Sequence, residues 1–305
     1  MNVEFAQQLC ELNNRFYRTW ADSFSDTRHN TWPGWEKCLQ ETGLRSTPQK
    51  PQTARTSRTA PAEADNTPFK LSAADTYEPA AIDGLPGPAK PSPAAHPLNI
   101  LDVACGNLRF EMFLARTISF RPLFVDAFDV CDELAQSGAE QPGVAALRYH
   151  HCDVMDELQK ETLNGVLCDA NPADLTVSFG FMHHIPLPEW RAAFIDDLLN
   201  ATKPGGFVCL SLWRFLSNKG MAERANATTA QGIAELGLDK LQFNEGDRLL
   251  GWKNEPSAYR YCHSFSDAEI AALAESTFEK ATLKARFQAD GRTGNLNEYL
   301  VLQRV

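Results

Sequence analysis

The sequence predicts an α/β protein in which a doubly wound, mostly parallel sheet of seven strands follows N-terminal helices. Three observations predict this class. The apolar strand at 98–103 leads through an acidic residue into a tight turn and an amphipathic segment. Strands and helices then alternate along the chain, which is the pattern of a parallel sheet. Finally, the tetrapeptide Lys203-Pro204-Gly205-Gly206 precedes another apolar strand.

The individual elements follow from short apolar runs and from helical spacing. Five strands are expected at 98–103, 122–128, 147–151, 175–179 and 207–213. Helices are expected at 107–117, 189–202 and 267–276, and Ser266 is a suitable N-cap for the last of them. Two further strands, near 281–287 and 297–302, are expected to form a hairpin around Asp290-Gly291.

Composition divides the chain into three regions. Residues 1–44 form an N-terminal helical segment, with large apolar residues at spacings of three and four: Phe5, Leu9, Leu12, Phe16 and Trp20. A second short helix begins near Trp32-Pro33 and is ended by Gly43. Residues 45–97 hold ten of the 18 prolines and almost no large aliphatic residues, so we expect a disordered insert there. Residues 98–305 form the domain that carries the chemistry.

Charge and cysteine usage limit the function classes. The 305-residue chain has a net charge of −10, which argues against binding nucleic acid over the whole surface but leaves a local basic patch open. No run of about 18 apolar residues occurs, so we expect no membrane helix. The N-terminus lacks a signal-peptide pattern, and the eight cysteines form no C-x-x-C pair. We therefore expect a cytoplasmic protein without structural zinc.

The turn after the first strand is a candidate site for a nucleotide-like cofactor. Ligands of open parallel sheets bind outside the carboxyl ends of the strands, where Asp102, Ala104, Cys105 and Gly106 are expected to lie. Gly106 allows close backbone approach, and the next helix offers free N–H groups. A dinucleotide site needs G-x-G-x-x-G, and the lack of further glycines disfavours a pyrophosphate. The alternative is an ordinary strand–helix turn without a ligand.

Two further acidic positions fit the same cofactor. Asp129, at the end of the second strand and 23 residues after Gly106, can accept both hydroxyls of a ribose, with Asp126 as its rival. Either carboxylate could instead cap the next helix. Asp153, after the third strand, can accept a hydrogen bond from an adenine amine or serve as an N-cap.

The segment after the fourth strand is the last candidate. Gly180 permits the backbone to pass close to a ligand. The adjacent pair His183-His184 suggests a metal, but neighbouring side chains diverge and no acidic or cysteine partner lies at ligand spacing, so we expect no metal site. A histidine near a substrate and a structural histidine remain equally open.

Taken in order, these residues resemble the class I S-adenosylmethionine-dependent methyltransferases over about 100–215. The family pattern at the first turn is D-x-G-x-G-x-G, and Ala104 and Leu108 replace its outer glycines here. The resemblance implies a Rossmann-like methyltransferase fold over 98–305, with S-adenosylmethionine as the cofactor. Residues 102–106 would line its methionine portion, Asp129 its ribose, and Asp153 with Val154 its adenine. Phe179 and Gly180 would lie beside the sulfonium.

A narrower resemblance extends beyond this core. The segments 24–32, 246–253 and 260–265 resemble the F-S-x-T-R-x-x-x-W, G-D-x-x-V-P-W-x and R-Y-Y-H-x-F segments of the tRNA wobble-uridine carboxymethyl methyltransferases. Gly251 and Cys262 depart from these patterns. The resemblance implies methyl-ester formation on the carboxymethyl group of the wobble uridine. It also implies tRNA as a partner and a small zinc-binding activator protein as another.

The expected chemistry is an in-line displacement, for which the protein aligns the groups and excludes water. A carboxylate acceptor is already ionised and needs no base, whereas other acceptors do. Three histidines are candidates for such a base: His183, His184 and His263. Arg28, Arg260 and Lys253 are candidates to hold an anionic substrate, although each could instead form a surface ion pair.

Three function classes stay open at this point. The first is a tRNA-modifying methyltransferase, for which the C-terminal basic residues offer modest support. The second is a small-molecule O- or carboxyl-methyltransferase, in which aromatic residues of the N-terminal segment would cover an apolar substrate. The third is a protein that binds the cofactor without catalysing methyl transfer.

Overall fold

The computed structural model describes residues 1–27, 30–44, 96–118, 121–136, 144–253 and 255–305. Almost all of the predicted insert at 45–97 lies outside the described residues, as does Arg28, one of the predicted substrate-holding residues. The predicted strands and the other predicted site residues lie within the described ranges.

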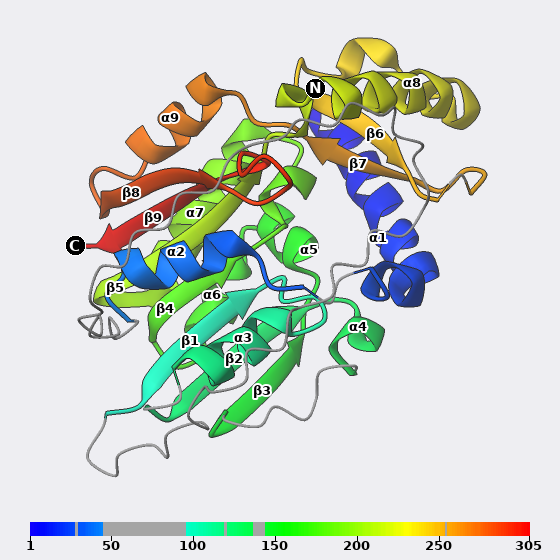
Figure 1. Ribbon diagram of the computed structural model, residues 1–305. Helices are drawn as coiled ribbons and strands as arrows, with labels where there is room; N and C mark the ends of the chain where they lie inside the picture. Colours follow the sequence, from blue (N-terminus) through cyan, green and yellow to red (C-terminus); the bar gives the residue numbers. More distant parts are fainter. Residues whose placement is uncertain (28–29, 45–95, 119–120, 137–143, 254) are drawn as a thin grey trace, which may run out of the picture.

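The main sheet has seven strands in the order β3-β2-β1-β4-β5-β9-β8 (Figure 1). Their bounds are β1 (Leu98–Val103), β2 (Leu123–Asp129), β3 (Ala146–His151), β4 (Ala173–Ser178), β5 (Thr202–Trp213), β8 (Ala281–Ala289) and β9 (Asn297–Arg304). The first five are parallel, while β9 runs antiparallel to both β5 and β8. The predicted seven-stranded, mostly parallel sheet is therefore confirmed. Its strand order reverses between β1 and β4.

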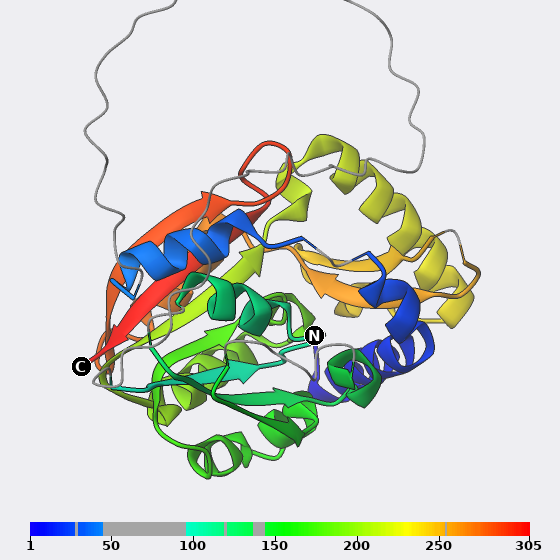
Figure 2. The same ribbon diagram turned by 60° about the horizontal axis from the view of Figure 1, so that its bottom comes forward.

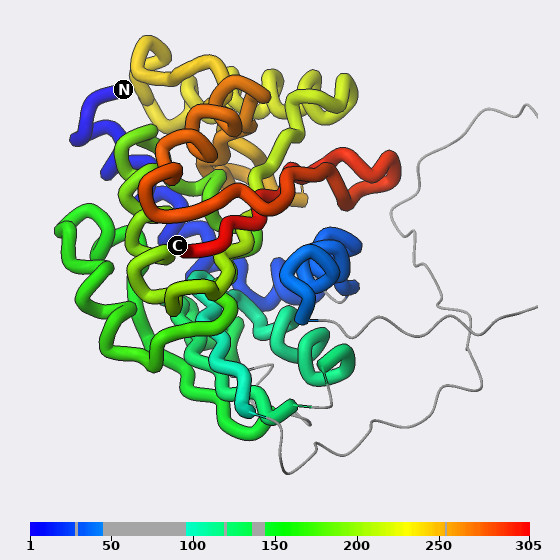
Figure 3. Tube along the Cα trace, turned by 90° about the vertical axis from the view of Figure 1, so that its left-hand side faces the viewer, coloured from blue at the N-terminus to red at the C-terminus, as the bar shows by residue number. Residues whose placement is uncertain are grey.

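Helices cover both faces of this sheet. One face carries α2 (Pro33–Glu41), α3 (Arg109–Thr117) and α4 (Asp132–Gln136). The other carries α5 (Val154–Gln159), α6 (Leu163–Cys168), α7 (Pro188–Ala201) and α9 (Asp267–Glu275). In Figure 3, α2 and α3 lie on the opposite side of the sheet from the green helices that include α7. The predicted helices at 107–117, 189–202 and 267–276 correspond to α3, α7 and α9.

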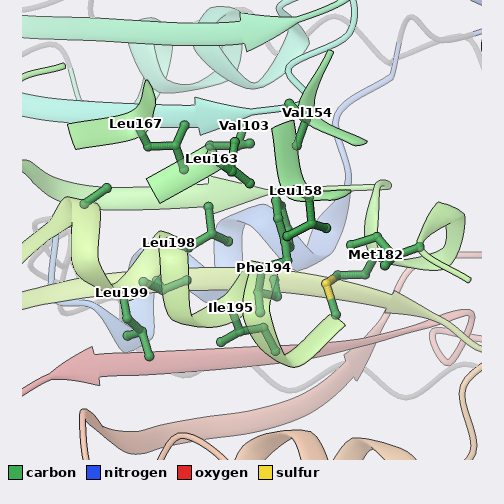
Figure 4. Close-up of a cluster of buried hydrophobic side chains, with 14 of the residues drawn as sticks. Val103, Val154, Leu158, Leu163, Leu167, Met182, Phe194, Ile195, Leu198 and Leu199 are labelled. Carbon is green, nitrogen blue, oxygen red and sulfur yellow. The ribbon is translucent and has the colours of Figure 1, made fainter. Parts of the chain in front are cut away.

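Alternation of side chains within each strand builds two cores. In β1, Leu98 and Ile100 face the layer of α2 and α3, whereas Leu101 and Val103 face α5–α7. Figure 4 shows Val103 in the second core, among aliphatic side chains of α5, α6 and α7. Burying one such aliphatic side chain contributes about 1.5–3 kcal/mol. Both faces of the parallel strands are covered, which is why these strands read as nearly continuous apolar runs.

A second, smaller structural unit was not predicted. β6 (Asp247–Gly251) and β7 (Tyr259–His263) form an antiparallel hairpin that packs between α1 (Val3–Ser25) and α8 (Lys219–Leu236). Figures 1 and 2 show this unit beside the carboxyl end of strand β5 of the main sheet. The apolar side of α1 supplies its core with Phe5, Leu9 and Leu12. The hairpin was missed because the helix that completes its core, α1, is over 200 residues away in the sequence. The hairpin residues by themselves show only a weak strand pattern.

The predicted N-terminal helices are present, and the expected stripe on α1 is largely buried. Within the described part of the chain, no helix has the length and apolar content needed to cross a membrane. All eight cysteines are free thiols.

Candidate cofactor and acceptor site

A cavity of about 510 Å³ lies at the carboxyl ends of the parallel strands, where the strand order reverses. This volume is in the range of small-molecule sites. Every residue predicted to bind the cofactor lines it: Asp102, Ala104, Cys105, Gly106, Asp129, Asp153, Val154, Phe179 and Gly180. His183, His184 and Arg260 line it as well. The structure thus brings the predicted residues together, while their individual roles stay predictions.

The turn after β1 has an unusual backbone. Ala104, Gly106 and Leu108 all have a positive φ, of 63°, 59° and 57°. A side chain in this left-handed region costs about 1–2 kcal/mol per residue. The structure therefore uses left-handed backbone at the three positions where the resembled family has glycine. Leu108 is 1% exposed and packs in the core that contains Trp35. This packing explains why leucine stands at a position where the backbone favours glycine.

Asp129 hydrogen-bonds to the backbone of this turn. Its Oδ2 accepts a hydrogen bond from the Gly106 N–H at 2.8 Å, and its Oδ1 accepts one from the Cys131 N–H at 2.9 Å. Burial raises the pKa of Asp129, although these backbone hydrogen bonds oppose the shift. The rival Asp126 contacts Arg148 at 2.6 Å and His150 at 2.8 Å, and it does not line the cavity. Of the two candidates, only Asp129 is placed to meet a ligand there.

Asp153 combines the two roles that the sequence left open. Its Oδ1 accepts a hydrogen bond from the Asp156 N–H at 3.1 Å and so caps α5. Its Oδ2 accepts one from Asn14 Nδ2 at 2.8 Å, and both Asp153 and Asn14 line the cavity. The N-cap interpretation is confirmed, and the adenine contact stays a prediction.

His184 sits in a hydrogen-bond network rather than in solvent. Its Nε2 lies 2.9 Å from the Tyr17 hydroxyl, and its Nδ1 lies 3.1 Å from the Tyr261 carbonyl oxygen and 3.2 Å from Asn13 Nδ2. Burial, followed by the nearby Arg260 charge, lowers the pKa of His184 to about 3. An imidazole with this pKa is a weak base at neutral pH. His184 is therefore better suited to orient Tyr17 than to remove a proton.

The other two candidate bases differ from His184. His183 lines the cavity and packs against Trp213, with ring centroids 5.0 Å apart. His263 does not line the cavity; its ring nitrogens contact Asp247 at 2.7 Å and Glu269 at 2.9 Å. His263 therefore belongs to a structural network outside the cavity. The prediction that it could serve as the base is wrong.

Three potential metal ligands lie closer together than the sequence indicated. The ligand atoms of His183, His184 and Cys262 are all within 4.8 Å of one another. Both ring nitrogens of His184 already have polar neighbours, and burial raises the pKa of the Cys262 thiol to about 11. The neighbouring Arg260 guanidinium would repel a cation. These features favour a hydrogen-bond network at this position.

Arg260 lines the cavity with a buried guanidinium. Its guanidinium carbon lies 5.0 Å from the ring centroid of Phe16, 5.6 Å from that of Phe24 and 5.5 Å from that of Trp252. The residue is 6% exposed, and its Nη1 has no hydrogen-bond acceptor among the described residues. A buried guanidinium with an unused donor calls for an anion.

The three segments of the narrower resemblance meet at this guanidinium. Phe24 comes from 24–32, Trp252 from 246–253 and Arg260 from 260–265, and the Phe24 and Trp252 rings lie 5.5 Å apart. Lys253, from the second segment, contacts Ser23 Oγ with its Nζ at 2.9 Å. The first segment is more than 200 residues away from the other two, so only the fold brings it next to them.

One wall of the cavity was missed in the sequence. Four α1 residues at spacings of three and four line it: Cys10, Asn13, Asn14 and Tyr17. The feature of α1 that the sequence reveals is its apolar stripe, which packs on the hairpin. Two adjacent asparagines beside that stripe were the available signal, and it is weak because asparagine is common on exposed helix surfaces.

No protein-family model matches the chain. A 168-residue stretch is 27% identical to the carbamoyl phosphate synthase large chain of Pyrococcus furiosus, covering 51% of this chain. The chain spans only 15% of the length of that relative, so this match does not establish a family.

Among solved structures, similar folds occur in S-adenosylmethionine-dependent methyltransferases. One from Methanosarcina mazei is 17% identical, with a TM-score of 0.47 and coverage of 68% of this chain and 92% of that one. The N-methyltransferase NodS from Bradyrhizobium japonicum, in complex with S-adenosylhomocysteine, is 14% identical, with a TM-score of 0.39 and coverage of 68% and 78%. These values are too low to transfer an activity. The sheet order itself matches the predicted Rossmann-like methyltransferase fold.

Proposed function

We propose that this chain transfers a methyl group from S-adenosylmethionine to a buried anionic acceptor. The acceptor that we propose in particular is the carboxymethyl group on the wobble uridine of a tRNA. The observation that carries this proposal is Arg260, a buried guanidinium with an unused donor at one end of the cavity.

The end of the cavity at the turn after β1 fits the cofactor. A Cβ added to Gly106 would meet no atom within 4 Å, so the turn leaves open space where a ligand can approach the backbone. Asp102, Asp129 and Asp153 line this end, and none of them forms an ion pair with a lysine or arginine of the described residues. Such a site favours a ligand that carries positive charge. A bound S-adenosylmethionine supplies a methyl group that is already activated by its sulfonium.

The chain's own contribution is then binding, orientation and exclusion of water. Arg260 holds the acceptor carboxylate, and the rings of Phe16, Phe24 and Trp252 shield it from solvent. Tyr17, oriented by His184, provides a polar group in the cavity wall. Because a carboxylate is ionised at neutral pH, the reaction needs no base, which agrees with the depressed pKa of His184.

The tRNA substrate is the finer part of this proposal. It is supported by the convergence of Phe24, Trp252 and Arg260, one from each segment that resembles the wobble-uridine enzymes. Aromatic side chains next to an arginine also suit a planar base that carries an anionic substituent. The small activator protein that the resemblance implies would act on the same reaction.

A second candidate is carboxyl methylation of a small acid. It is favoured by the state of the C-terminal basic residues, on which the tRNA interpretation partly relied. Lys280 pairs with Asp196, and Arg286 pairs with Asp267 and Glu298. Arg304 donates to the Asn200 carbonyl oxygen. These side chains are occupied within the protein, so they offer little free charge to a phosphate backbone.

The test is methyl transfer to paired substrates. The protein is incubated with labelled S-adenosylmethionine and an anticodon stem-loop that carries or lacks the carboxymethyl group, with and without a candidate activator. Mass spectrometry should find a base-labile methyl ester only on the carboxymethylated RNA. Activity on small carboxylic acids instead would support the second candidate. Binding of the cofactor without transfer to any acceptor would reduce the chain to a binding protein.

Arg260→Ala should abolish transfer, because the acceptor loses its charged partner, yet it should leave the Kd for S-adenosylhomocysteine within about twofold. Arg116→Ala, which removes an exposed arginine from α3, is the matched control and should be fully active. Equal activity of the wild type and Arg260→Ala would contradict the proposal.

A further inference from the structure

The structure contains a second cavity, of about 560 Å³, that the proposed chemistry leaves unused. Its lining comes mainly from α8 and from the β6–β7 hairpin. Figure 1 shows α8 packed along this hairpin. The volume is again in the range of small-molecule sites, so this cavity can hold a chemical group of its own.

Arg260 connects the second cavity with the first. Of the described residues, it alone lines both. Its guanidinium carbon lies 5.6 Å from the ring centroid of Phe24, which lines the first cavity, and 5.5 Å from that of Trp252, which lines the second. The boundary between the cavities therefore contains a guanidinium with an aromatic ring on either side. Because Arg260 is 6% exposed and its Nη1 has no acceptor among the described residues, it can still take an anionic partner.

Hydrogen bonds to the end of α1 hold this boundary in place. Trp252 Nε1 donates to Ser23 Oγ at 3.1 Å, and Lys253 Nζ donates to the same oxygen at 2.9 Å. Ser23 directly precedes Phe24 near the C-terminal end of α1. The wall around Arg260 is thus preformed by two segments that are far apart in the sequence.

The charges in the second cavity favour an anion. Three cationic side chains and two carboxylates line it: Arg224, Lys253, Arg260, Glu235 and Glu255. Arg224 is exposed, and its guanidinium forms no hydrogen bond or ion pair with the described part of the chain. Glu235 is occupied, because its two oxygens accept from the Tyr259 hydroxyl at 3.0 Å and from Gln231 Nε2 at 2.8 Å. The cavity therefore offers an available guanidinium beside a small excess of positive charge.

The second cavity also offers an aromatic surface. Trp252 is partly exposed and lines it, and Tyr259 lines it as well. Aromatic and guanidinium groups in one wall suit a planar base that is joined to a phosphate. An aliphatic acid would use the charges but not the rings.

The size of the reacting group points in the same direction. A carboxymethyl group is much smaller than either cavity, and in-line transfer requires it to share the first cavity with the cofactor. If Arg260 holds its carboxylate, the rest of the acceptor begins at the residue that both cavities share. The second cavity is then the adjoining space with matching charge.

We infer that the second cavity is a subsite for the planar, anionic part of the acceptor next to its reacting carboxylate, which in an RNA acceptor is a neighbouring nucleotide. The inference rests on the proposed function and names a part of the substrate that this function does not assign. Arg224 binds the phosphate, Trp252 stacks on the base, and Arg260 joins this subsite to the carboxylate.

The experiment measures inhibition of the methylation of a carboxymethylated anticodon stem-loop by the full chain. The inhibitors are the carboxymethyluridine nucleoside and the two dinucleotides that add one neighbour on its 5′ or 3′ side. In the wild type, one dinucleotide should have an inhibition constant about tenfold below that of the nucleoside, as expected for one additional charge-assisted contact. The comparison does not require that any inhibitor is itself methylated.

Arg224→Glu should remove this advantage of the dinucleotide and leave the inhibition constant of the nucleoside within about twofold, because the nucleoside does not reach the subsite. Lys219→Glu makes the same change of charge at an exposed position of α8 outside the cavity, and it should behave as the wild type. Gly251→Phe fills the cavity without a change of charge and should resemble Arg224→Glu. A Cβ at Gly251 has only an ordinary contact there, with Thr228 Cγ2 at 3.6 Å.

The outcomes separate this inference from the proposed function. If the stem-loop is methylated but the nucleoside and both dinucleotides inhibit equally, the second cavity is not a subsite and only the inference fails. The same holds if Arg224→Glu and Lys219→Glu change the dinucleotide advantage to the same extent. If no carboxymethylated RNA is methylated, the proposed tRNA substrate fails and the inference fails with it.

Discussion

At the scale of single residues, the turn after β1 combines a strained backbone with a well-packed side chain. Ala104 and Leu108 adopt the left-handed backbone that glycine adopts without strain. For Leu108, burial of the side chain offsets that strain, since it is 1% exposed in the apolar core. Ala104 is only partly buried and gains much less from its methyl group.

Ala104→Gly should therefore raise the free energy of unfolding, by about 0.5–1 kcal/mol, because relief of the left-handed strain exceeds the entropy cost of glycine. The measurement is urea denaturation followed by circular dichroism. Ala115→Gly, which makes the same change in the regular helix α3, should lower it by about 1 kcal/mol. A loss of stability in Ala104→Gly would show that the turn is not strained at this position.

At the scale of elements, close backbone approach fixes helix α2 on the sheet. A Cβ built on Gly34 would lie 2.1 Å from the ring of Tyr299 in β9. The Gly34 N–H donates to Asp290 Oδ1 at 3.0 Å, and the Tyr299 hydroxyl donates to Asp290 Oδ2 at 2.6 Å. The β8–β9 turn and the N-terminus of α2 thus form one hydrogen-bonded junction beside the cavity.

Gly34→Ala should destabilise the chain by more than about 2 kcal/mol, because the added methyl group overpacks this junction. It should also weaken binding of S-adenosylhomocysteine, since α2 and the β8–β9 turn both line the cavity. Gly165→Ala in α6, where a Cβ meets nothing within 4 Å, is the control and should be neutral or stabilising by up to about 1 kcal/mol. Thermal denaturation with and without ligand measures both effects.

A second element-scale feature is the start of α9. Glu269 accepts from the Ser266 N–H at 2.9 Å in a capping box and contacts His263 Nε2 at 2.9 Å. Burial by itself would raise the pKa of Glu269, but the hydrogen bonds from His263 and Ser266 outweigh it and lower the pKa to about 2. The capping box thereby joins α9 to the β6–β7 hairpin.

Stability should depend on pH through this group. Because the folded pKa of Glu269 lies below the ordinary value of 4.5, the ionised form contributes stability that is complete above about pH 5 and is lost as the pH falls toward 2. Glu269→Gln should reduce stability at neutral pH and flatten its decline below pH 5. Urea denaturation from pH 3 to 7 tests this, with the exposed Glu275→Gln as the control. An unchanged slope in Glu269→Gln would show that other acids dominate.

At the scale of the whole molecule, α1 joins the two sheets around the cavity. Its apolar side packs on the β6–β7 hairpin, while Asn14 holds Asp153 at the edge of the main sheet. Asn13 Oδ1 accepts from the Tyr261 N–H at 2.7 Å, and Tyr17 contacts His184. The cavity is therefore closed by groups from the N-terminus, the main sheet and the hairpin together.

We expect both sheets to unfold in one transition that the cofactor shifts as a whole. S-adenosylhomocysteine at 100 times its Kd should raise the free energy of unfolding by about 2.7 kcal/mol. Tryptophan fluorescence, which includes Trp252 in the loop after β6, and far-ultraviolet circular dichroism should report the same midpoint with and without ligand. Separate midpoints would mean that the hairpin unit unfolds independently of the main sheet.

The sequence by itself determined the main sheet and one side of the site. Apolar runs, their alternation with helices and the acidic residues at strand ends depend on local spacing, and each strand of the main sheet lies within a few residues of its predicted position. The cofactor-side residues follow these strand ends, so the topology alone placed Asp102, Asp129 and Asp153 in one cavity.

Only the tertiary structure decided the rest, because the contacts join residues far apart in the chain. The β6–β7 hairpin depends on a core supplied by α1, and the surroundings of Arg260 combine Phe16 and Trp252 from opposite ends of the sequence. The lowered pKa of His184 arises from burial. Burial is a property of the packed molecule, and local spacing could not reveal it.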